Sequence, residues 1–420
     1  SEINSMRRAS TTLLNARLIS LIDELLRAVS EALCARGVNA PMMIVRGDGS
    51  LMTEAFAREC PVETMLSGPA ASITGAMRLS GVGDMVCVDI GGTTTDLAVV
   101  RGGRTSLVSD GVNVGAWRTG TRAIAIRTIG LGGDSAVEWD SHKGLRLLDT
   151  RALPLCALAS RCPGIKDDLV RMRGDERQTT YNRGVFYLLN RRPPAHFDAT
   201  GGESAMLGAL AEGPLCVEAL AAKMGTKPYF IRPGRLETMG IILRAQLTPT
   251  DMLHLSGAYG AFDREASELG LELLAFQSDA RGEDIREAVM DMAGEKLFDL
   301  ISRELFARAN PRMERQPGAT RAAYRPMGDE IEIQYRMNLP VVGIGAPAGA
   351  LLERAVGRLH AELILPEDYR VANAVGAITG SVLCESRVEI KPHYDALGIN
   401  GYSAHASDER FESEELEIGR

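Results

Sequence analysis

The residues whose types and spacing suggest chemistry are 89–96, an octapeptide with the sequence DIGGTTTD. Its paired glycines let the backbone turn tightly and leave amide N–H groups uncovered, and the threonine hydroxyls add hydrogen-bond donors, so the turn can cradle a phosphate. The two terminal carboxylates, Asp89 and Asp96, are placed to hold a hydrated Mg²⁺ or to orient a water molecule. For the octapeptide alone, a plain β-hairpin whose glycines only make the turn is the alternative.

The residues around this turn predict how it is positioned. Residues 85–108 contain the β-rich runs MVCVDI and DLAVV, a second turn RGGR and the run TSLV, which together predict a β-meander. Small residues dominate 67–79, as expected of a helix that lies close against another backbone. A strand predicted at 124–129 leads into a glycine-rich turn at 130–135, which is expected to open a helix or loop and suits a close approach of the backbone to a ligand.

The remaining sequence predicts an α/β fold. Apolar residues at helical spacing mark an amphipathic helix at 10–36, and helix-favouring residues occupy 250–309. Alternating strands and helices near the C-terminal end indicate α/β layers; we expect strands at 330–335, 341–344 and 362–365, and helices beginning at Leu351 and Ala372. Composition shifts at the Pro- and Gly-containing stretch 190–203, which is typical of a linker. The boundaries that follow are 1–190, 191–250, 251–330 and 331–420.

Taken together, several segments resemble the hydantoinase A/5-oxoprolinase family. They are SGPAA at 67–71, DIGGTTTD at 89–96, TIGLGGDS at 128–135, GIGAPAG at 343–349 and VANAVGA at 371–377. The resemblance covers residues 1–140 and 240–410 well and the region between them poorly. It implies an actin-like (ribonuclease H-like) ATPase fold of the actin, Hsp70 and sugar-kinase superfamily, in which two similar α/β halves close on a nucleotide, and it implies ATP and Mg²⁺ as cofactors.

The resemblance also assigns roles to individual residues. Asp89 would face the Mg²⁺ and the attacked γ-phosphate, and Asp96 would support the turn or the metal-bound waters. Contacts to phosphate oxygens would come from Gly91, Gly92, Thr93 and Thr94. The nucleotide would be approached from the hinge side by Gly130, Gly132, Gly133 and Asp134. Contacts to adenosine would come from Gly345, Ala346 and Pro347. For residues 345–349 alone, an ordinary helix N-terminus is the alternative reading.

Such ATPases also need a first phosphate loop, itself usually of the DxGGTxTD kind. This chain has one copy of that motif, and its first residues resemble what the family shows after an N-terminal domain. We therefore expect a missing N-terminal domain of roughly 150–200 residues. With half of the clamp absent, the chain by itself should bind ATP weakly; tight, Mg²⁺-dependent binding seen by calorimetry would contradict this.

The function implied by the resemblance is ATP-dependent, ring-opening hydrolysis of a cyclic amide, a hydantoin or 5-oxoproline, through phosphorylation of the amide oxygen. A hydantoinase B-like subunit is an expected partner. One alternative is a subunit of an ATP-dependent ketone carboxylase. A second alternative, from a different class, is a nucleotide-sensing regulatory protein.

The regulatory alternative depends on residues 207–247, whose order of helices and turns resembles a winged-helix module. Binding of DNA would require exposed basic side chains on its second helix, and Lys223, Lys227, Arg232 and Arg235 are near enough to allow it. In an acidic chain, such a module is more often a packing or regulatory subdomain. Nucleic acid is therefore not an expected partner.

Composition excludes other classes. The 420 residues carry 47 basic and 55 acidic side chains, a formal net charge of −8, which disfavours a large surface for nucleic acid or anionic membranes. Seven scattered cysteines without a CxxC pair indicate a reduced, intracellular protein. No apolar run approaches the ~20 residues that cross a bilayer, so a soluble, cytoplasmic protein is expected. The six histidines lack the close pairing of zinc ligands.

Overall fold

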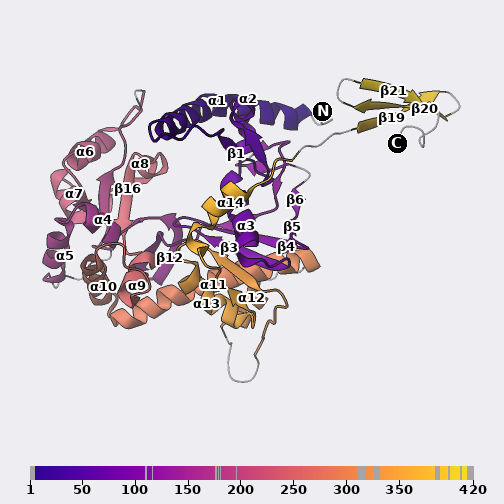
Figure 1. The fold of residues 1–420 in the computed structure, drawn as a ribbon. Helices are drawn as coiled ribbons and strands as arrows, with labels where there is room; N and C mark the ends of the chain where they lie inside the picture. Colours follow the sequence, from indigo (N-terminus) through magenta and orange to yellow (C-terminus); the bar gives the residue numbers. More distant parts are fainter. Residues whose placement is uncertain are drawn as a thin grey trace.

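A mixed β-sheet organises the computed structural model (Figure 1). The structure describes residues 5–108, 111–115, 117–175, 177, 179, 181–194, 196–310, 312, 317–325, 332–383, 388–395, 398–406 and 409–413. Among these, six strands form the sheet: β3 (Met85–Ile90), β4 (Thr95–Arg101), β5 (Arg104–Thr105), β10 (Arg127–Ile129), β17 (Val341–Ile344) and β18 (Leu363–Ile364). Their order is β10-β4-β3-β17-β18, with β5 paired to β4.

The register of this sheet sets up the site. β3 and β4 form an antiparallel hairpin in which Asp89 lies directly opposite Asp96. β17 runs parallel to β3, with Ile344 beside Asp89, and β18 runs parallel to β17. Because β3 and β17 are parallel, the loops that follow them leave the sheet at the same edge, which is where open α/β sheets bind ligands.

Helices cover both faces of the sheet, and the alternation along β3 shows which face is which. Met85 and Cys87 pack in one core with α3 (Ser67–Ser80) and with Ala372 at the start of α14 (Ala372–Thr379). Val86 and Val88 point the other way, into the larger core that contains α11 (Gly282–Ala309) and α13 (Ala348–Arg358). Residues 85–88 of β3 are all apolar because both faces of the strand are buried there.

Glycines bring α3 and α14 into direct backbone contact. A Cβ atom at Gly75 would lie 1.9 Å from the carbonyl oxygen of Ala372, and one at Gly376 would lie 1.8 Å from the carbonyl oxygen of Ala71. No side chain fits at either position. The close approach expected of the small-residue helix is therefore present, and its partner is α14.

A second sheet with its own helices lies beside the first core. Its strands, in the order β13-β16-β14-β15, are β13 (Leu153–Pro154), β16 (Ile242–Gln246), β14 (Phe186–Leu189) and β15 (Leu215–Cys216). Around it are α6 (Gly201–Leu210), α7 (Val217–Lys223) and α8 (Gly234–Thr238), which share a small separate core, and the 3₁₀ helix η2 (Pro228–Phe230), none of whose residues is buried. Four more helices join the larger core: α4 (Leu155–Arg161), α5 (Ile165–Arg173), α9 (Pro249–Ser256) and α10 (Arg264–Ser278).

The remaining elements complete the described chain. In chain order they are α1 (Ser5–Cys34), β1 (Met43–Val45), β2 (Leu51–Thr53), α2 (Glu54–Glu59), η1 (Pro61–Thr64), β6 (Leu107–Val108), β7 (Asn113–Val114), β8 (Trp117–Arg118), β9 (Ala123–Ile124), β11 (Ser135–Asp140), β12 (Gly144–Arg151), α12 (Pro317–Tyr324), η4 (Tyr369–Val371), β19 (Val388–Asp395), β20 (Gly398–Ala406) and β21 (Glu409–Ser413). Within the described part of the chain, no helix is long and apolar enough to cross a membrane.

The structure departs from the sequence expectations at three places. The strand expected at 124–129 is two short strands, β9 and β10. β6, which the sequence placed in the meander, pairs with β9. The glycine-rich turn that follows leads into the strand β11. Of the strand expected at 330–335, residues 330 and 331 lie outside the described residues, and 332–335 form no strand.

Candidate functional site

The turn between β3 and β4 exposes the glycines and threonine of the DIGGTTTD octapeptide. Gly91, Gly92 and Thr93 are exposed, and Thr94 is half-buried. The N–H of Gly91 donates to the carbonyl oxygen of Thr94 at 2.9 Å, which closes the turn. The tip therefore faces outward, with its geometry fixed from within the hairpin, as a surface for an anion requires.

The second glycine-rich segment is hydrogen-bonded to this turn. The N–H of Gly133 donates to the carbonyl oxygen of Gly91 at 3.1 Å, and the N–H of Asp134 donates to that of Gly92 at 2.7 Å. A Cβ atom at Gly132 would lie 2.4 Å from the carbonyl oxygen of Gly92. Gly132 to Asp134 thus support the turn by contact, and the N–H groups of Gly133 and Asp134 are occupied by the chain itself.

Gly345, at the end of β17, approaches the turn from the other side. Its φ is +90°, and a Cβ atom there would lie 2.2 Å from the carbonyl oxygen of Ile90 and 2.9 Å from Oδ1 of Asp89. Both the backbone angle and the close approach require glycine. The structure therefore brings the three predicted segments together at one edge of the sheet.

Asp89 is held by α3 and α14. The hydroxyl of Ser72 donates to its carboxylate, and the side-chain amide of Asn373 donates to the oxygen of Ser72 at 3.1 Å and to the carbonyl of Gly68 at 2.9 Å. Burial raises the pKa of Asp89, and the nearby charge of Asp96 raises it further, against the hydrogen bond from Ser72. The SGPAA and VANAVGA segments thus position this carboxylate.

Asp96 and Asp134 lie at the same edge as half-buried carboxylates. Asp96 accepts a hydrogen bond from the hydroxyl of Thr128, and burial raises its pKa against that bond. Asp134 makes an ion pair with Arg151 at 3.3 Å, and burial likewise raises its pKa. Because Asp89 and Asp96 are directly opposed across an antiparallel pair, their side chains share one face of the hairpin.

This donor set is of the kind that Mg²⁺ takes with a nucleotide. No group of three His, Cys, Asp or Glu side chains poised to share a metal occurs among the described residues. Mg²⁺ commonly accepts one or two carboxylates and completes its shell with waters and substrate phosphates. Asp89 and Asp96, beside an exposed anion-binding turn, fit that pattern.

A cavity of about 160 Å³ opens next to the turn and gathers several of the predicted residues. It is lined by Gly92, Gly133, Asp134, Thr250, Leu253, Tyr259, Phe262, Ala346 and Pro347. Gly130 is not among them and instead packs against Asp149, since a Cβ atom there would lie 2.9 Å from the Cβ of Asp149. The sequence predicts a helical stretch at 250–309 and does not point to the four residues from that stretch that line the cavity, which are Thr250, Leu253, Tyr259 and Phe262.

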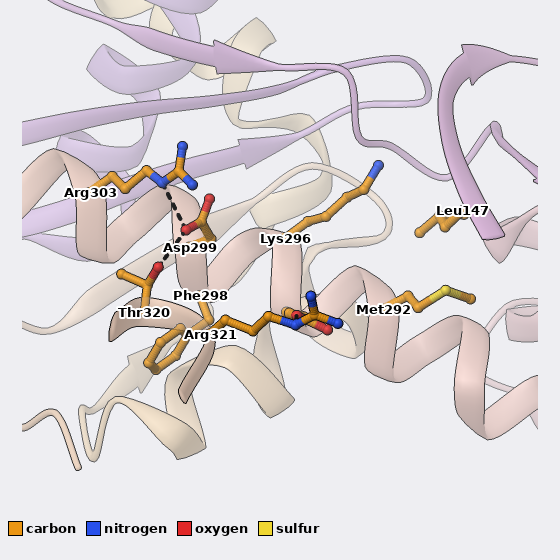
Figure 2. A pocket seen from close by; sticks show the side chains of 9 residues that line it. Leu147, Met292, Lys296, Phe298, Asp299, Arg303, Thr320 and Arg321 are labelled. Carbon is orange, nitrogen blue, oxygen red and sulfur yellow. Dashed lines mark hydrogen bonds and ion pairs between the residues drawn. The ribbon is translucent and has the colours of Figure 1, made fainter. Parts of the chain in front are cut away.

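A larger cavity, of about 430 Å³, lies between β12, α11 and α12 (Figure 2). Its charged side chains are engaged within the chain: Lys296 with Asp149, Asp299 with Arg303 and Thr320, and Arg321 with Glu295. Size alone does not make a binding site, and the groups suited to chemistry lie at the smaller cavity.

Three of the four basic side chains named for contact with DNA, those of Lys223, Arg232 and Arg235, have partners within the chain. Lys223 pairs with Glu212 at 2.7 Å, and Arg235 pairs with Glu203 at 2.9 Å while its guanidinium lies 4.4 Å from the ring centroid of Phe197. Arg232 donates to the carbonyls of Tyr229 and Ile231. These contacts favour a packing role over contact with DNA phosphates.

The fold is of the α/β class. Among solved structures, the nucleotide-free structure of an acetone carboxylase, from work on ATP-dependent acetone carboxylation, matches with a TM-score of 0.52 at 14% identity, over 93% of this chain and 42% of that chain. An ATP-dependent caprolactamase from Pseudomonas jessenii matches with a TM-score of 0.49 at 16% identity, over 93% of this chain and 43% of that chain.

The sequence comparison is more specific. Residues 8–154 match the model of the hydantoinase/oxoprolinase family, so over this part the chain is similar to that family. The alpha subunit of caprolactamase from Pseudomonas jessenii is 28% identical over 149 residues, which are 35% of this chain. The chain spans 21% of the length of that curated relative.

Proposed function

We propose that the chain is the nucleotide-binding part of an enzyme that opens a cyclic amide by ATP-dependent hydrolysis. The observation that carries this proposal is the exposed Gly91–Thr94 turn, flanked by the opposed carboxylates Asp89 and Asp96 and supported by Gly132 and Gly345. Tight glycine turns beside acidic side chains at the carboxyl edge of a sheet suit a metal-bound polyphosphate.

Each group has a distinct task in this proposal. The free edge of the turn would hold phosphate oxygens through backbone and threonine donors, and Asp89 and Asp96 are the carboxylates that would hold the metal. ATP supplies the phosphoryl group that converts the amide oxygen into a leaving group. The contribution of the chain is positioning and charge stabilisation, the main means by which proteins assist phosphoryl transfer.

The relatives support the class of substrate. The family description names hydantoinases and oxoprolinases, and the curated relative is named a caprolactamase, so each name refers to a cyclic amide. That relative is an alpha subunit, which supports a hydantoinase B-like chain as a partner. We propose ATP and Mg²⁺ as cofactors on the same grounds, together with the donor set described above.

The test of the nucleotide site is Asp89→Asn. The amide keeps the shape of the side chain and removes the charge, so ATP hydrolysis coupled to ring opening should fall by at least 100-fold while the melting temperature stays close to that of the wild type. Asp84→Asn is the matched control, because Asp84 lies at the far end of the same hairpin, where its carboxylate accepts a hydrogen bond from the N–H of Gly102. Equal turnover in Asp89→Asn and the wild type would remove Asp89 from the mechanism.

Substrate identity needs a separate test. A panel of hydantoins, 5-oxoproline, caprolactam, and acetone with bicarbonate should be scored by ATP-dependent phosphate release, using the complete protein with its partner subunit. Release with a cyclic amide supports the proposal. Release only with acetone and bicarbonate would favour the ketone carboxylase, and specific retardation of DNA without any turnover would favour the regulatory protein.

A further inference from the structure

The cavity beside the turn has an aromatic side to which the family resemblance assigns no role. Tyr259 and Phe262 line it together with Leu253 and Pro347, opposite the turn residue Gly92. Its volume of about 160 Å³ is below the ~300 Å³ at which pockets for whole drug-sized ligands begin, so it suits one ring system of a larger ligand. Only one of the lining residues, Asp134, carries a charge, and it lies at the end nearest the turn.

The loop that carries these two rings is fixed at both ends. α9 ends at Gly257, whose φ is +77°, and the N–H of Tyr259 donates to the carbonyl oxygen of Leu253 at 3.2 Å. At the other end, Asp263 caps α10 by accepting from the N–H of Ala266 at 3.1 Å. Both anchors lie within four residues of the rings, so the rings have defined positions in the absence of ligand.

His254 joins the two rings from behind. It is 2% exposed, its Nδ1 lies 2.8 Å from the carbonyl oxygen of Tyr259, and the two rings are stacked with centroids 5.0 Å apart. Phe262 meets the imidazole edge-on at 5.7 Å. Because a carbonyl only accepts, Nδ1 carries the proton, and because burial lowers the pKa of His254, the ring is neutral. His254 therefore holds the aromatic pair without contacting the cavity.

We propose that Tyr259 and Phe262 are the surface against which the base of the nucleotide stacks, and that His254 is a positioning residue for them. This inference rests on the proposed function, because it takes the phosphates to lie on the Gly91–Thr94 turn. Tyr259 and Phe262 are nearly perpendicular, at 76° with centroids 6.0 Å apart, so a flat, uncharged base can stack on one ring and meet the other edge-on. Pro347 adds to the apolar lining, and stacking of this kind makes a large contribution to the binding of nucleic-acid bases.

The test separates the base from the phosphates. Binding of Mg-ATP and of Mg-tripolyphosphate, which lacks base and ribose, is measured on the complete protein for the wild type, Tyr259→Ala and Phe262→Ala. Each substitution should weaken ATP binding about tenfold and leave tripolyphosphate binding within about twofold. Phe230→Ala is the matched control, because Phe230 is 65% exposed on η2 and does not line the cavity; it should change neither affinity.

The role of His254 is tested by the ratio of the affinity for Mg-ATP to the affinity for Mg-tripolyphosphate. His254→Asn keeps a donor near the position of Nδ1 and should retain more of the preference for ATP over tripolyphosphate than His254→Ala, whereas a purely structural role would lower both affinities together. Unchanged ATP binding in Tyr259→Ala and Phe262→Ala would overturn the inference, as would equal wild-type affinity for ATP and tripolyphosphate, and both results leave the phosphate turn intact. Absence of binding of either ligand to the wild type would overturn the proposed function as well.

Discussion

Asp89 and Asp96 form a coupled pair of carboxylates, and their coupling is open to measurement. The two side chains are opposed across the hairpin, and the charge of Asp96 contributes to the raised pKa of Asp89. A carboxylate that holds a metal must be ionised. The raised pKa therefore moves the acid limit of Mg-ATP binding to a higher pH than an ordinary aspartate would give.

The first prediction concerns this acid limit in Asp96→Asn. Removing the Asp96 charge removes one cause of the raised pKa, so the pKa of Asp89 falls. Mg-ATP binding weakens overall, because Asp96 also holds the metal in our proposal, but the pH at which binding is half lost lies lower than in the wild type. Calorimetric titrations between pH 4 and pH 8 measure the shift. Asp84→Asn, which lies away from the site, should leave the limit in place, and movement of the limit to higher pH would contradict the coupling.

At the scale of elements, the contact between α3 and α14 links the stability of the fold to the site. The backbones touch at Gly75 and Gly376. The same two helices supply Ser72, which donates to Asp89, and Asn373, which donates to Ser72. A side chain inserted at the contact must push the helices apart. The hydrogen bonds that fix the carboxylate would then lengthen.

The second prediction is that Gly376→Ala destabilises the protein by about 2 kcal/mol, because its methyl group would lie 1.8 Å from the carbonyl oxygen of Ala71. Mg-ATP binding should weaken in the same variant. The matched control is Gly357→Ala in α13, where a Cβ atom meets nothing within 4 Å and alanine should stabilise the helix by up to about 1 kcal/mol. Urea unfolding measures both, and equal stability of the two variants would show that the helices can separate without cost.

Asp251 joins three further elements. It is fully buried and accepts hydrogen bonds from the N–H groups of Thr248 at 2.9 Å and Cys156 at 2.9 Å and from the hydroxyl of Ser267 at 2.8 Å. One carboxylate thus caps α9, meets the start of α4 and binds α10. These elements carry the loop that contains Tyr259 and Phe262.

The third prediction is that Asp251→Ala lowers the free energy of unfolding by about 3 kcal/mol, because several buried donors lose their acceptor at once. Asp263→Ala removes the N-cap of α10 at a more exposed position and should cost about 1 kcal/mol. Thermal or urea unfolding of the two variants gives the comparison. A cost at Asp251 no larger than that at Asp263 would mean that water replaces the lost acceptor.

The sequence predicts an element well when neighbouring residues determine it, and poorly when distant parts of the chain determine it. The hairpin around Gly91 and Gly92 and the helix beginning at Ala372 follow from local turn chemistry and small-residue patterns, and both are confirmed. The strand expected at 124–129 divides because β9 pairs with β6 whereas β10 pairs with β4, and both partner strands lie outside the segment itself. The four domain boundaries remain a prediction.

The aromatic side of the cavity shows why the site was predicted only in part. Tyr259 and Phe262 lie far from the glycine motifs in sequence, and they reach the turn only because α9 and α10 pack on the larger core. A local signal was present: Gly257 and Gly260 interrupt the helix-favouring stretch just before the capping residue Asp263. That signal marks a loop, but nothing local says which surface the loop meets.

At the scale of the whole molecule, the cavity joins three parts of the chain that are distant in sequence. Gly92 and Asp134 come from the first part, Thr250 to Phe262 from the second, and Ala346 and Pro347 from the third. A ligand that contacts all three stabilises their arrangement as a unit. Its effect on unfolding is then global, since binding to the native state alone adds free energy that grows with ligand concentration.

The fourth prediction is that Mg-ATP at 100 times its Kd stabilises the complete protein by about 2.7 kcal/mol, seen as a higher melting temperature, and slows amide hydrogen exchange in all three parts together. Exchange in α7 and α8, which belong to the separate small core, is the internal control and should change least. Tyr259→Ala should show a smaller thermal shift at the same ATP concentration. Protection confined to residues 89–96 would mean that the turn binds the phosphates alone, with the other two parts of the chain making no contact with the ligand.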